Sequence, residues 1–321
     1  NKYDQNDLSE LNRVCEGYKL FLDKGKTERE CVRQTIDMAE KAGYRDLEGL
    51  LSERPIKEGD KVYSVCMGKT LALFRIGSGD LEDGMNILGA HIDSPRLDIK
   101  QNPLYESDGL AYLDTHYYGG IKKYQWVAQP MSIHGTAALE DGSAKIIDIG
   151  EDPGDPVFVF TDLLIHLSAQ RQEKKAAEVI TGEGLDLLVG NMPLDKSKLT
   201  DDEKDAVKAN VLAFLNEKYG LEEADLLSAE LEIVPAGHAR DLGFDRSMVL
   251  GYGQDDRVCS YTSLIAMLEI ADKNIDKTAC CLLVDKEEIG SYGATGMKSK
   301  FFENALAEVM NACGQYSELK L

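Results

Sequence analysis

The chain has little positive charge and no long hydrophobic run. Its 36 Lys and Arg face 57 Asp and Glu, and the resulting net charge of −21 opposes binding to nucleic acid. No stretch approaches the length of a membrane-spanning run, and no basic-then-apolar leader opens the sequence. We therefore expect neither nucleic acid nor a membrane among its partners.

Cysteine pairing motifs are also missing. The seven cysteines are odd in number, and none of them form a CxxC pair. This pattern argues against a disulfide scaffold and for a reducing compartment, so we predict a cytoplasmic protein. The apolar fraction of 43% is enough to build a core, and 321 residues predict one large or two moderate domains.

The most informative residues are two adjacent acids after an apolar run. Residues 279–284 read as a buried strand, and Glu287 and Glu288 follow closely. Adjacent side chains at a strand end point in different directions, so one acid can hold a metal while the other faces a water molecule. Two uncompensated acids there are costly unless cations or protons neutralise them. The pair predicts a metal site, the alternative being surface acids beside Lys286.

A second apolar strand, 86–90, leads to His91 and Asp93. A histidine and an acid two positions apart share a face, so Asp93 can accept the far N–H of the imidazole and make it a better metal ligand. A third acidic cluster, Asp255 and Asp256, precedes a helical run from 258 to 271. These acids could also be a helix N-cap pair, and we expect Asp256 to cap while Asp255 binds metal.

The spacing of these segments predicts an α/β fold with an open mixed sheet and flanking helices. Strands that end in ligands and lead into helices place those ligands along the carboxyl edge of such a sheet, which suits a pair of metal ions. A capping box at 27–30 predicts a helix that stops at Gly43, and 62–67 with 71–76 predict a hairpin.

Between these parts the pattern changes to short β-like segments. We expect strands at 124–127, 131–138, 145–149 and 157–160, and a capping box at 200–203 that opens a helix ending at Gly220. The predicted domains are therefore a catalytic domain in two parts, residues 1–96 and 247–321, and an inserted β-rich domain, residues 97–246.

The ordered set of motifs resembles the M18 family of metallo-aminopeptidases, which includes aspartyl aminopeptidases. The segments that carry the resemblance are 91–97, 254–258 and 285–291, together with 115–120 and 163–167. The resemblance implies that His91, Asp255 and Glu288 are metal ligands, with Asp255 bridging two ions. It implies that Asp93 lies behind His91 and that Glu287 is the general base. It also implies that His166 reaches the active site of a neighbouring subunit, although His166 could instead be a packed histidine.

The implied function is removal of the N-terminal residue from peptides by water that two divalent ions activate. The ions would be Zn²⁺, with Mn²⁺ or Co²⁺ as alternatives. The resemblance further implies that the insertion is a lid and oligomerisation domain of a homo-oligomer, a dodecamer. A related di-metal amidohydrolase or deacylase and a catalytically silent assembly protein remain as alternatives.

The chain departs from the family pattern after Glu288. Family members carry a further aspartate ligand and a final histidine ligand, but only 33 residues follow Glu288 here and no histidine lies beyond His238. Three ligands cannot fill two zinc spheres. We therefore expect this chain to be the leading part of a longer protein, the alternative being a chain that has lost activity.

Overall fold

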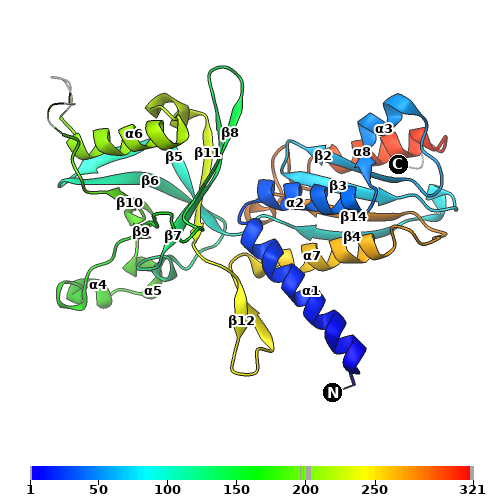
Figure 1. The fold of residues 1–321 in the computed structure, drawn as a ribbon, viewed down its shortest axis with the longest axis horizontal. Coiled ribbons are helices and arrows are strands. Elements are labelled where there is room, and N and C mark those ends of the chain that lie inside the picture. Colours follow the sequence, from blue (N-terminus) through cyan, green and yellow to red (C-terminus); the bar gives the residue numbers. More distant parts are fainter. Residues whose placement is uncertain (1, 196, 198, 200–203, 319–321) are drawn as a thin grey trace. The chain divides into compact units, whose positions relative to one another are not determined.

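The computed structural model describes residues 2–195, 197, 199 and 204–318. They form two compact units, which Figure 1 draws as ribbons. Unit 1 comprises residues 1–94 and 238–321, and unit 2 comprises residues 95–237. The insertion predicted at 97–246 therefore shares residues 97–237 with unit 2, while 238–246 lie in unit 1.

A mixed five-stranded sheet forms the centre of unit 1, in the order β1-β2-β3-β14-β4. β14 pairs with β4 in parallel and with β3 antiparallel, and β2 and β3 form the predicted hairpin. Its strands are β1 (Arg45–Asp46), β2 (Lys61–Cys66), β3 (Thr70–Arg75), β4 (Asn86–His91) and β14 (Ala279–Val284). The two strands predicted to carry the ligands are thus neighbours.

Helices cover both faces of this sheet. On one face α1, α2 and α7 bury Phe21, Val32 and Leu264 against Leu73 and Cys281. On the other face α3 and α8 form a second apolar core against β3 and β14. The helices are α1 (Gln5–Lys24), α2 (Glu28–Lys41), α3 (Leu47–Glu53), α7 (Gln254–Glu269) and α8 (Phe301–Ala312), with short 3-10 turns η1 (Leu81–Asp83) and η7 (Glu287–Ile289). Successive side chains along β3 and β14 point alternately into these two cores, because neighbouring side chains of a strand lie on opposite faces of the sheet.

Local signals explain where α2 begins and ends. Thr27 and Glu30 form the predicted capping box, since each side chain accepts the other residue's backbone N–H. The helix ends at Lys41, and Gly43 follows with φ +86°, a left-handed conformation that favours glycine. Both parts of this sequence prediction are confirmed.

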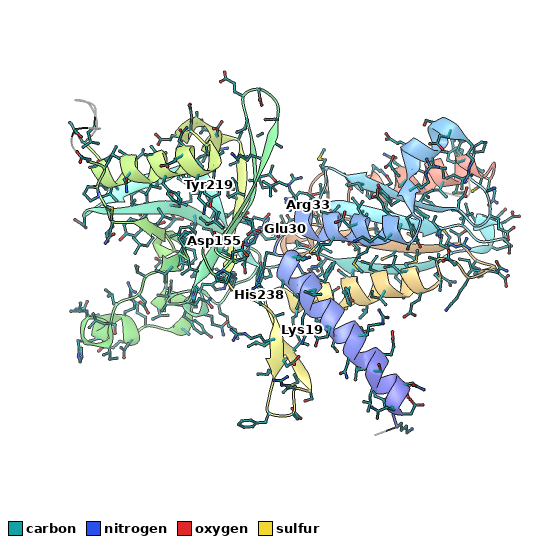
Figure 2. All side chains as sticks on the ribbon, viewed as in Figure 1. Lys19, Glu30, Arg33, Asp155, Tyr219 and His238 are labelled. Carbon is teal, nitrogen blue, oxygen red and sulfur yellow. The ribbon has the colours of Figure 1, made fainter. Side chains whose placement is uncertain are left out.

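A short hairpin, β12 (Arg240–Leu242) with β13 (Met248–Leu250), leads into α7. It is fixed to α1 by an ion pair between Lys19 Nζ and Asp241 Oδ1, 2.6 Å apart. Figure 2 labels Lys19, and also His238, whose Nδ1 lies 3.3 Å from Asp23 Oδ2 of the same helix. The end of the insertion predicted at residue 246 therefore falls inside this hairpin, between β12 and β13.

Unit 2 is built on a seven-stranded sheet in the order β8-β7-β11-β5-β6-β10-β9, and its paired strands are antiparallel. The strands are β5 (Arg96–Ser107), β6 (Leu110–Tyr118), β7 (Met131–Ala138), β8 (Ala144–Ile149), β9 (Val159–Phe160), β10 (Leu187–Gly190) and β11 (Ala229–Pro235). The helical segments of this unit are η2 (Lys123–Gln125), η3 (Ile165–Leu167), α4 (Ala169–Gln172), α5 (Ala176–Val179), η4 (Gly182–Gly184), α6 (Ala206–Tyr219) and η6 (Glu223–Leu227). The unit is mainly β, with α6 as its one long helix in the described ranges.

Most of the elements predicted in this region are present. Strands cover 131–138 and 144–149, and α6 ends at a left-handed Gly220 as expected. The strand predicted at 124–127 is wrong: Lys123–Gln125 forms a 3-10 turn, and Trp126 continues in a helical conformation. The capping box predicted at 200–203 lies outside the described residues. Among the helices that the structure describes, none is both long and apolar enough to cross a membrane.

Candidate metal centre

The candidate site lies at the carboxyl edge of the sheet in unit 1. β4 and β14 run parallel with Val284 opposite His91, so the residues after both strands meet at the same edge. Ile92 N–H donates to the carbonyl of Val284 (2.9 Å) and continues this pairing beyond the strand end. The register therefore brings His91 next to the loop that carries Glu287 and Glu288.

Asp93 organises the two sides of this edge. Its carboxylate is fully buried and accepts the backbone N–H groups of Glu287 at Oδ1 (3.2 Å) and Glu288 at Oδ2 (3.1 Å). The same Oδ1 lies 3.3 Å from Nδ1 of His91. Nδ1 also hydrogen-bonds to the backbone carbonyl of Asp93 (3.0 Å). The carbonyl and the carboxylate of Asp93 thus orient the imidazole together, and the carboxylate holds the acidic turn beside it. The sequence predicted the contact with His91 but not the two bonds to the turn.

Because Nδ1 of His91 faces Asp93, its Nε2 faces the open side of the site. Nε2 lies 3.3 Å from Asp255 Oδ1 and 3.6 Å from Glu287 Oε2. The histidine side chain is 11% exposed, whereas those of Asp255 and Glu287 are 85% and 56% exposed. A supported imidazole nitrogen therefore faces carboxylates that solvent and ligands can reach.

The two glutamates come from a turn and not from the strand end that the sequence reading assumed. β14 stops at Val284, Lys286 takes a left-handed conformation at φ +72°, and Glu287 and Glu288 open η7. The turn, rather than strand alternation, brings the side chains of Glu287 and Glu288 next to His91. Ligand atoms of His91, Glu287 and Glu288 all lie within 4.8 Å of one another.

Asp255 arrives by a third route, at the start of α7. Asp255 and Asp256 have non-helical backbone angles and are joined by a cis peptide bond. The hydroxyl of Ser94 donates to the carbonyl of Asp255 (2.9 Å), which ties this segment to the residues after β4. The kink places the non-helical Asp256 directly before the regular part of α7, and capping by its side chain stays a prediction.

Two side chains of α7 brace the strand that carries His91, and the sequence reading assigned neither of them a role. Arg257 is buried, and its guanidinium donates to the carbonyls of Ile92 (3.1 Å) and Lys26 (2.9 Å). Ser260 Oγ donates to the carbonyl of His91 (2.7 Å). In the sequence Arg257 follows two aspartates, a pattern typical of an exposed charged segment. Its structural role is visible only from its contacts with distant segments.

The acidic surroundings alter the protonation of the site. Burial lowers the pKa of His91, but the contact with Asp93 and the charge of Glu287 outweigh it and raise the pKa to about 9. Burial is also the largest cause that raises the pKa of Glu288, assisted by the charge of Asp93. The negative charge of Asp93 and Glu287 contributes to both shifts, and charge of this kind around an imidazole favours a bound cation.

These donors fit a divalent metal ion such as zinc. Imidazole nitrogen and carboxylate oxygen are ordinary zinc ligands, and a histidine whose second nitrogen contacts a carboxylate is the usual arrangement at such sites. His91, Glu287 and Glu288 have ligand atoms close enough to hold one ion, and Asp255 lies beside His91. His166, the remaining predicted site residue, lies in η3 of unit 2, where its side chain is exposed rather than packed.

Comparison with known proteins identifies relatives along almost the whole chain. The profile of the family described as "Aminopeptidase I zinc metalloprotease (M18)" matches residues 21–321. A "Probable M18 family aminopeptidase 1" from Clostridium acetobutylicum is 57% identical over 321 residues, which are 100% of this chain and 68% of that protein. The chain covers 65% of the corresponding protein from Borreliella burgdorferi, so it spans about two thirds of the length of these relatives.

Solved structures agree with this result. The crystal structure of an M18 aminopeptidase from Thermotoga maritima matches with a TM-score of 0.88 and 43% identity, over 97% of this chain and 66% of that one. The mApe1 dodecamer of S. cerevisiae matches with a TM-score of 0.72 over 95% of this chain and 67% of that one. At 19% identity the yeast structure shows a common fold alone.

Proposed function

Because this chain belongs to the M18 family of zinc metalloprotease aminopeptidases, we propose that the protein removes the N-terminal residue from peptides by metal-dependent hydrolysis. One observation carries the proposal. Nδ1 of His91 lies 3.3 Å from buried Asp93, while Nε2 of the same ring faces Asp255 and Glu287. This arrangement supports a metal ligand with a free carboxylate beside it, as hydrolysis of an amide requires.

His91, Asp255 and Glu288 are the proposed ligands, and zinc is the proposed metal. We infer two ions, since Asp255 is largely exposed and its two carboxylate oxygens can serve one ion each. When bound, the metal supplies Lewis-acid chemistry, polarising the scissile carbonyl and making water more acidic. Asp93 keeps the imidazole in the orientation that presents Nε2, because its oxygen faces Nδ1.

Glu287 is the proposed general base. Its carboxylate is more than half exposed, yet its backbone N–H is fixed by Asp93, so the side chain can meet water from a defined position. It would take a proton from the attacking water and return it to the leaving amine. The hydrolysed bond is then the first peptide bond, with the free α-amine of the substrate held in the acidic site.

Unit 2 is the proposed lid and assembly domain of a homo-oligomer. The yeast relative is a dodecamer, which supports assembly in this family. Around His166 the side chains of Leu163, Leu164, Ile165 and Leu167 are 45% to 67% exposed, an apolar surface that contact with another subunit would cover. We therefore propose that His166 reaches the active site of a neighbouring subunit and contacts the substrate there.

The experiment that tests catalysis is a Glu287→Gln substitution in the full-length protein, with Glu48→Gln on the exposed surface of α3 as the matched control. Glutamine keeps the shape of the side chain but cannot accept the proton. We expect turnover to fall by about 100-fold to 10,000-fold while metal content and melting temperature stay at wild-type values. Full activity in Glu287→Gln would refute the role of base.

Substrate class is tested with aminoacyl-p-nitroanilides that carry Asp, Glu, Leu or Lys, each with a free or a blocked amine. Release from free-amine substrates alone, dependent on added Zn²⁺, Mn²⁺ or Co²⁺, is the expected result. Release from blocked substrates would instead identify an amidohydrolase or deacylase. His91→Ala provides a separate measure, because it should lose metal as measured by elemental analysis.

A further inference from the structure

The acidic turn that follows β14 has a backbone conformation that its own residues do not favour. Lys286 has φ +72° and Ser291 has φ +64°, left-handed values that residues with a Cβ rarely adopt. Such values persist where surrounding contacts hold them. The side chain of Glu287 is 56% exposed, so its position depends on the backbone of this turn rather than on packing.

Two buried carboxylates hold three successive N–H groups of the turn. Asp93 accepts those of Glu287 and Glu288, and Asp285 Oδ1 accepts the one from Lys286 (2.8 Å). Both aspartates are fully buried, so water does not compete for these bonds. The turn is therefore fixed by Asp93 from the segment after β4 and by Asp285 from the end of β14.

Asp285 is itself fixed by two threonines in a closed cycle of hydrogen bonds. Its N–H donates to Oγ1 of Thr70 (3.0 Å), and the Thr70 hydroxyl donates to the carbonyl of Thr295. The Thr295 hydroxyl donates to Asp285 Oδ2, which closes the cycle. Thr70 and Thr295 are 1% and 5% exposed. Because Thr70 begins β3, an interior strand of the sheet, the cycle connects the turn to the rigid part of unit 1.

The same cycle anchors the segment that returns after the turn. Gly296 forms an isolated parallel bridge with Asp285, and a Cβ added to Gly296 would lie 2.3 Å from the carbonyl oxygen of Ser291. The N–H of Ser291 donates to the carbonyl of Lys286 (2.7 Å). Residues 285–296 therefore form a closed loop, and its two ends meet at the threonine hydroxyls.

We propose that Thr70 and Thr295 are positioning residues, which act through Asp285 to set the orientation of the Glu287 carboxylate. Glu287 is the general base in the proposed function, on which this inference rests. A base must lie within hydrogen-bonding distance of the water whose proton it takes, and a displacement of about 1 Å can lower turnover about 100-fold. The two hydroxyls bond to Asp285 and to the backbone of Thr295, so their loss should affect turnover more than metal content.

Thr295→Val in the full-length protein tests this proposal, because valine keeps the shape of the side chain and removes the hydroxyl. Thr35→Val is the matched control: Thr35 is also buried, and its hydroxyl donates to the carbonyl of Cys31 (2.8 Å) within α2. With saturating zinc, we expect kcat to fall about 10-fold to 100-fold in Thr295→Val, at unchanged KM and zinc content. Thr295→Ser should restore most of kcat, and Thr35→Val should keep it. Wild-type kcat in a folded Thr295→Val protein, or loss of zinc together with kcat, would overturn the proposal.

The Glu287→Gln background distinguishes a positioning role from a merely structural one. If Thr295 acts through the base, Thr295→Val should cause no further loss of kcat once residue 287 is glutamine. An equal fold-loss of kcat in both backgrounds would refute the positioning role. Full activity of Glu287→Gln alone would remove the base and this inference together, a result distinct from either outcome for Thr295.

Amide exchange in the unsubstituted protein decides the question if Thr295→Val does not fold. The N–H groups of Asp285 and Lys286 should exchange at least about 1,000-fold more slowly than in an unstructured peptide, because both are held within the cycle. Rapid exchange at both positions would show that the threonines do not hold the turn.

Discussion

Replacing Asp93 with asparagine should uncouple the two halves of the metal site. The wild-type carboxylate is fully buried and accepts two backbone N–H groups, one from Glu287 and one from Glu288, while facing Nδ1 of His91. Asparagine has the same shape but offers one acceptor oxygen and one NH₂ group. One of the two N–H donors of the turn must then face another donor, whichever way the amide is turned.

The magnitude follows from these contacts. A hydrogen bond to a charged acceptor contributes about 1.5 to 3 kcal/mol, and leaving a buried donor unsatisfied costs about 1 to 3 kcal/mol. Asp93→Asn should therefore reduce the free energy of unfolding by about 2 to 4 kcal/mol. Loss of a carboxylate behind a ligating histidine weakens metal binding by about 10-fold to 100-fold, and we expect that range here.

The assay is a zinc titration by calorimetry, together with urea denaturation of the metal-free protein. Asp60→Asn is the control: its carboxylate also accepts a backbone N–H, from Lys57, and pairs with Arg54 (2.7 Å). Asp60 precedes β2 and so lies at the end of the sheet away from the metal site. Its replacement should therefore reduce stability without changing zinc affinity. Wild-type zinc affinity in Asp93→Asn would refute the reasoning.

Three further outcomes follow from the structure. Lys69 Nζ lies 2.7 Å from Oε1 of buried Glu28. Lys69→Met should therefore lower the free energy of unfolding, measured by urea denaturation, by about 3 to 5 kcal/mol, because it leaves a buried charge without its partner. Adding Glu28→Gln removes that charge and should recover much of the loss. Burial raises the pKa of Cys281 to about 12, so this thiol stays protonated below that pH. Alkylation at pH 8 should therefore label the exposed Cys259 and spare the buried Cys281. Mass spectrometry that finds the reverse pattern would contradict this prediction. Gly135→Ala should lower the melting temperature by several degrees, because its Cβ would lie 1.9 Å from a carbonyl oxygen of β11, and an unchanged melting temperature would show that the strands yield.

The parts of the fold that could be predicted are those with local causes. The apolar runs of β4 and β14 and the capping box of Thr27 act within a few residues, and all three are present. The ligand clusters were recognisable because each follows or precedes a clearly periodic segment. The convergence of the two clusters that follow β4 and β14 then follows from the parallel pairing of these strands.

The parts that could not be predicted depend on contacts between distant segments. Residues 124–127 have strand-like composition, yet a 3-10 turn forms at Lys123–Gln125. Asp255 enters from a kinked helix start held by Ser94, and nothing in the local sequence indicates that hydroxyl bond. Arg257 is buried because two backbone carbonyls, of Ile92 and Lys26, accept its N–H groups. Hydrophobic periodicity carries no information about such bonds.

The geometry of the site is fixed by backbone bonds, while its charge is left unbalanced. Asp93 holds the N–H groups of the acidic turn, and Ser260 holds the carbonyl of His91, so the ligands cannot easily move apart to relieve repulsion. The raised pKa of Glu288 is caused first by burial and then by this repulsion, from Asp93, Asp255 and Glu287. A divalent cation relieves it without rearrangement of the backbone. Metal binding should therefore add stability to a site that is already formed, rather than create the site.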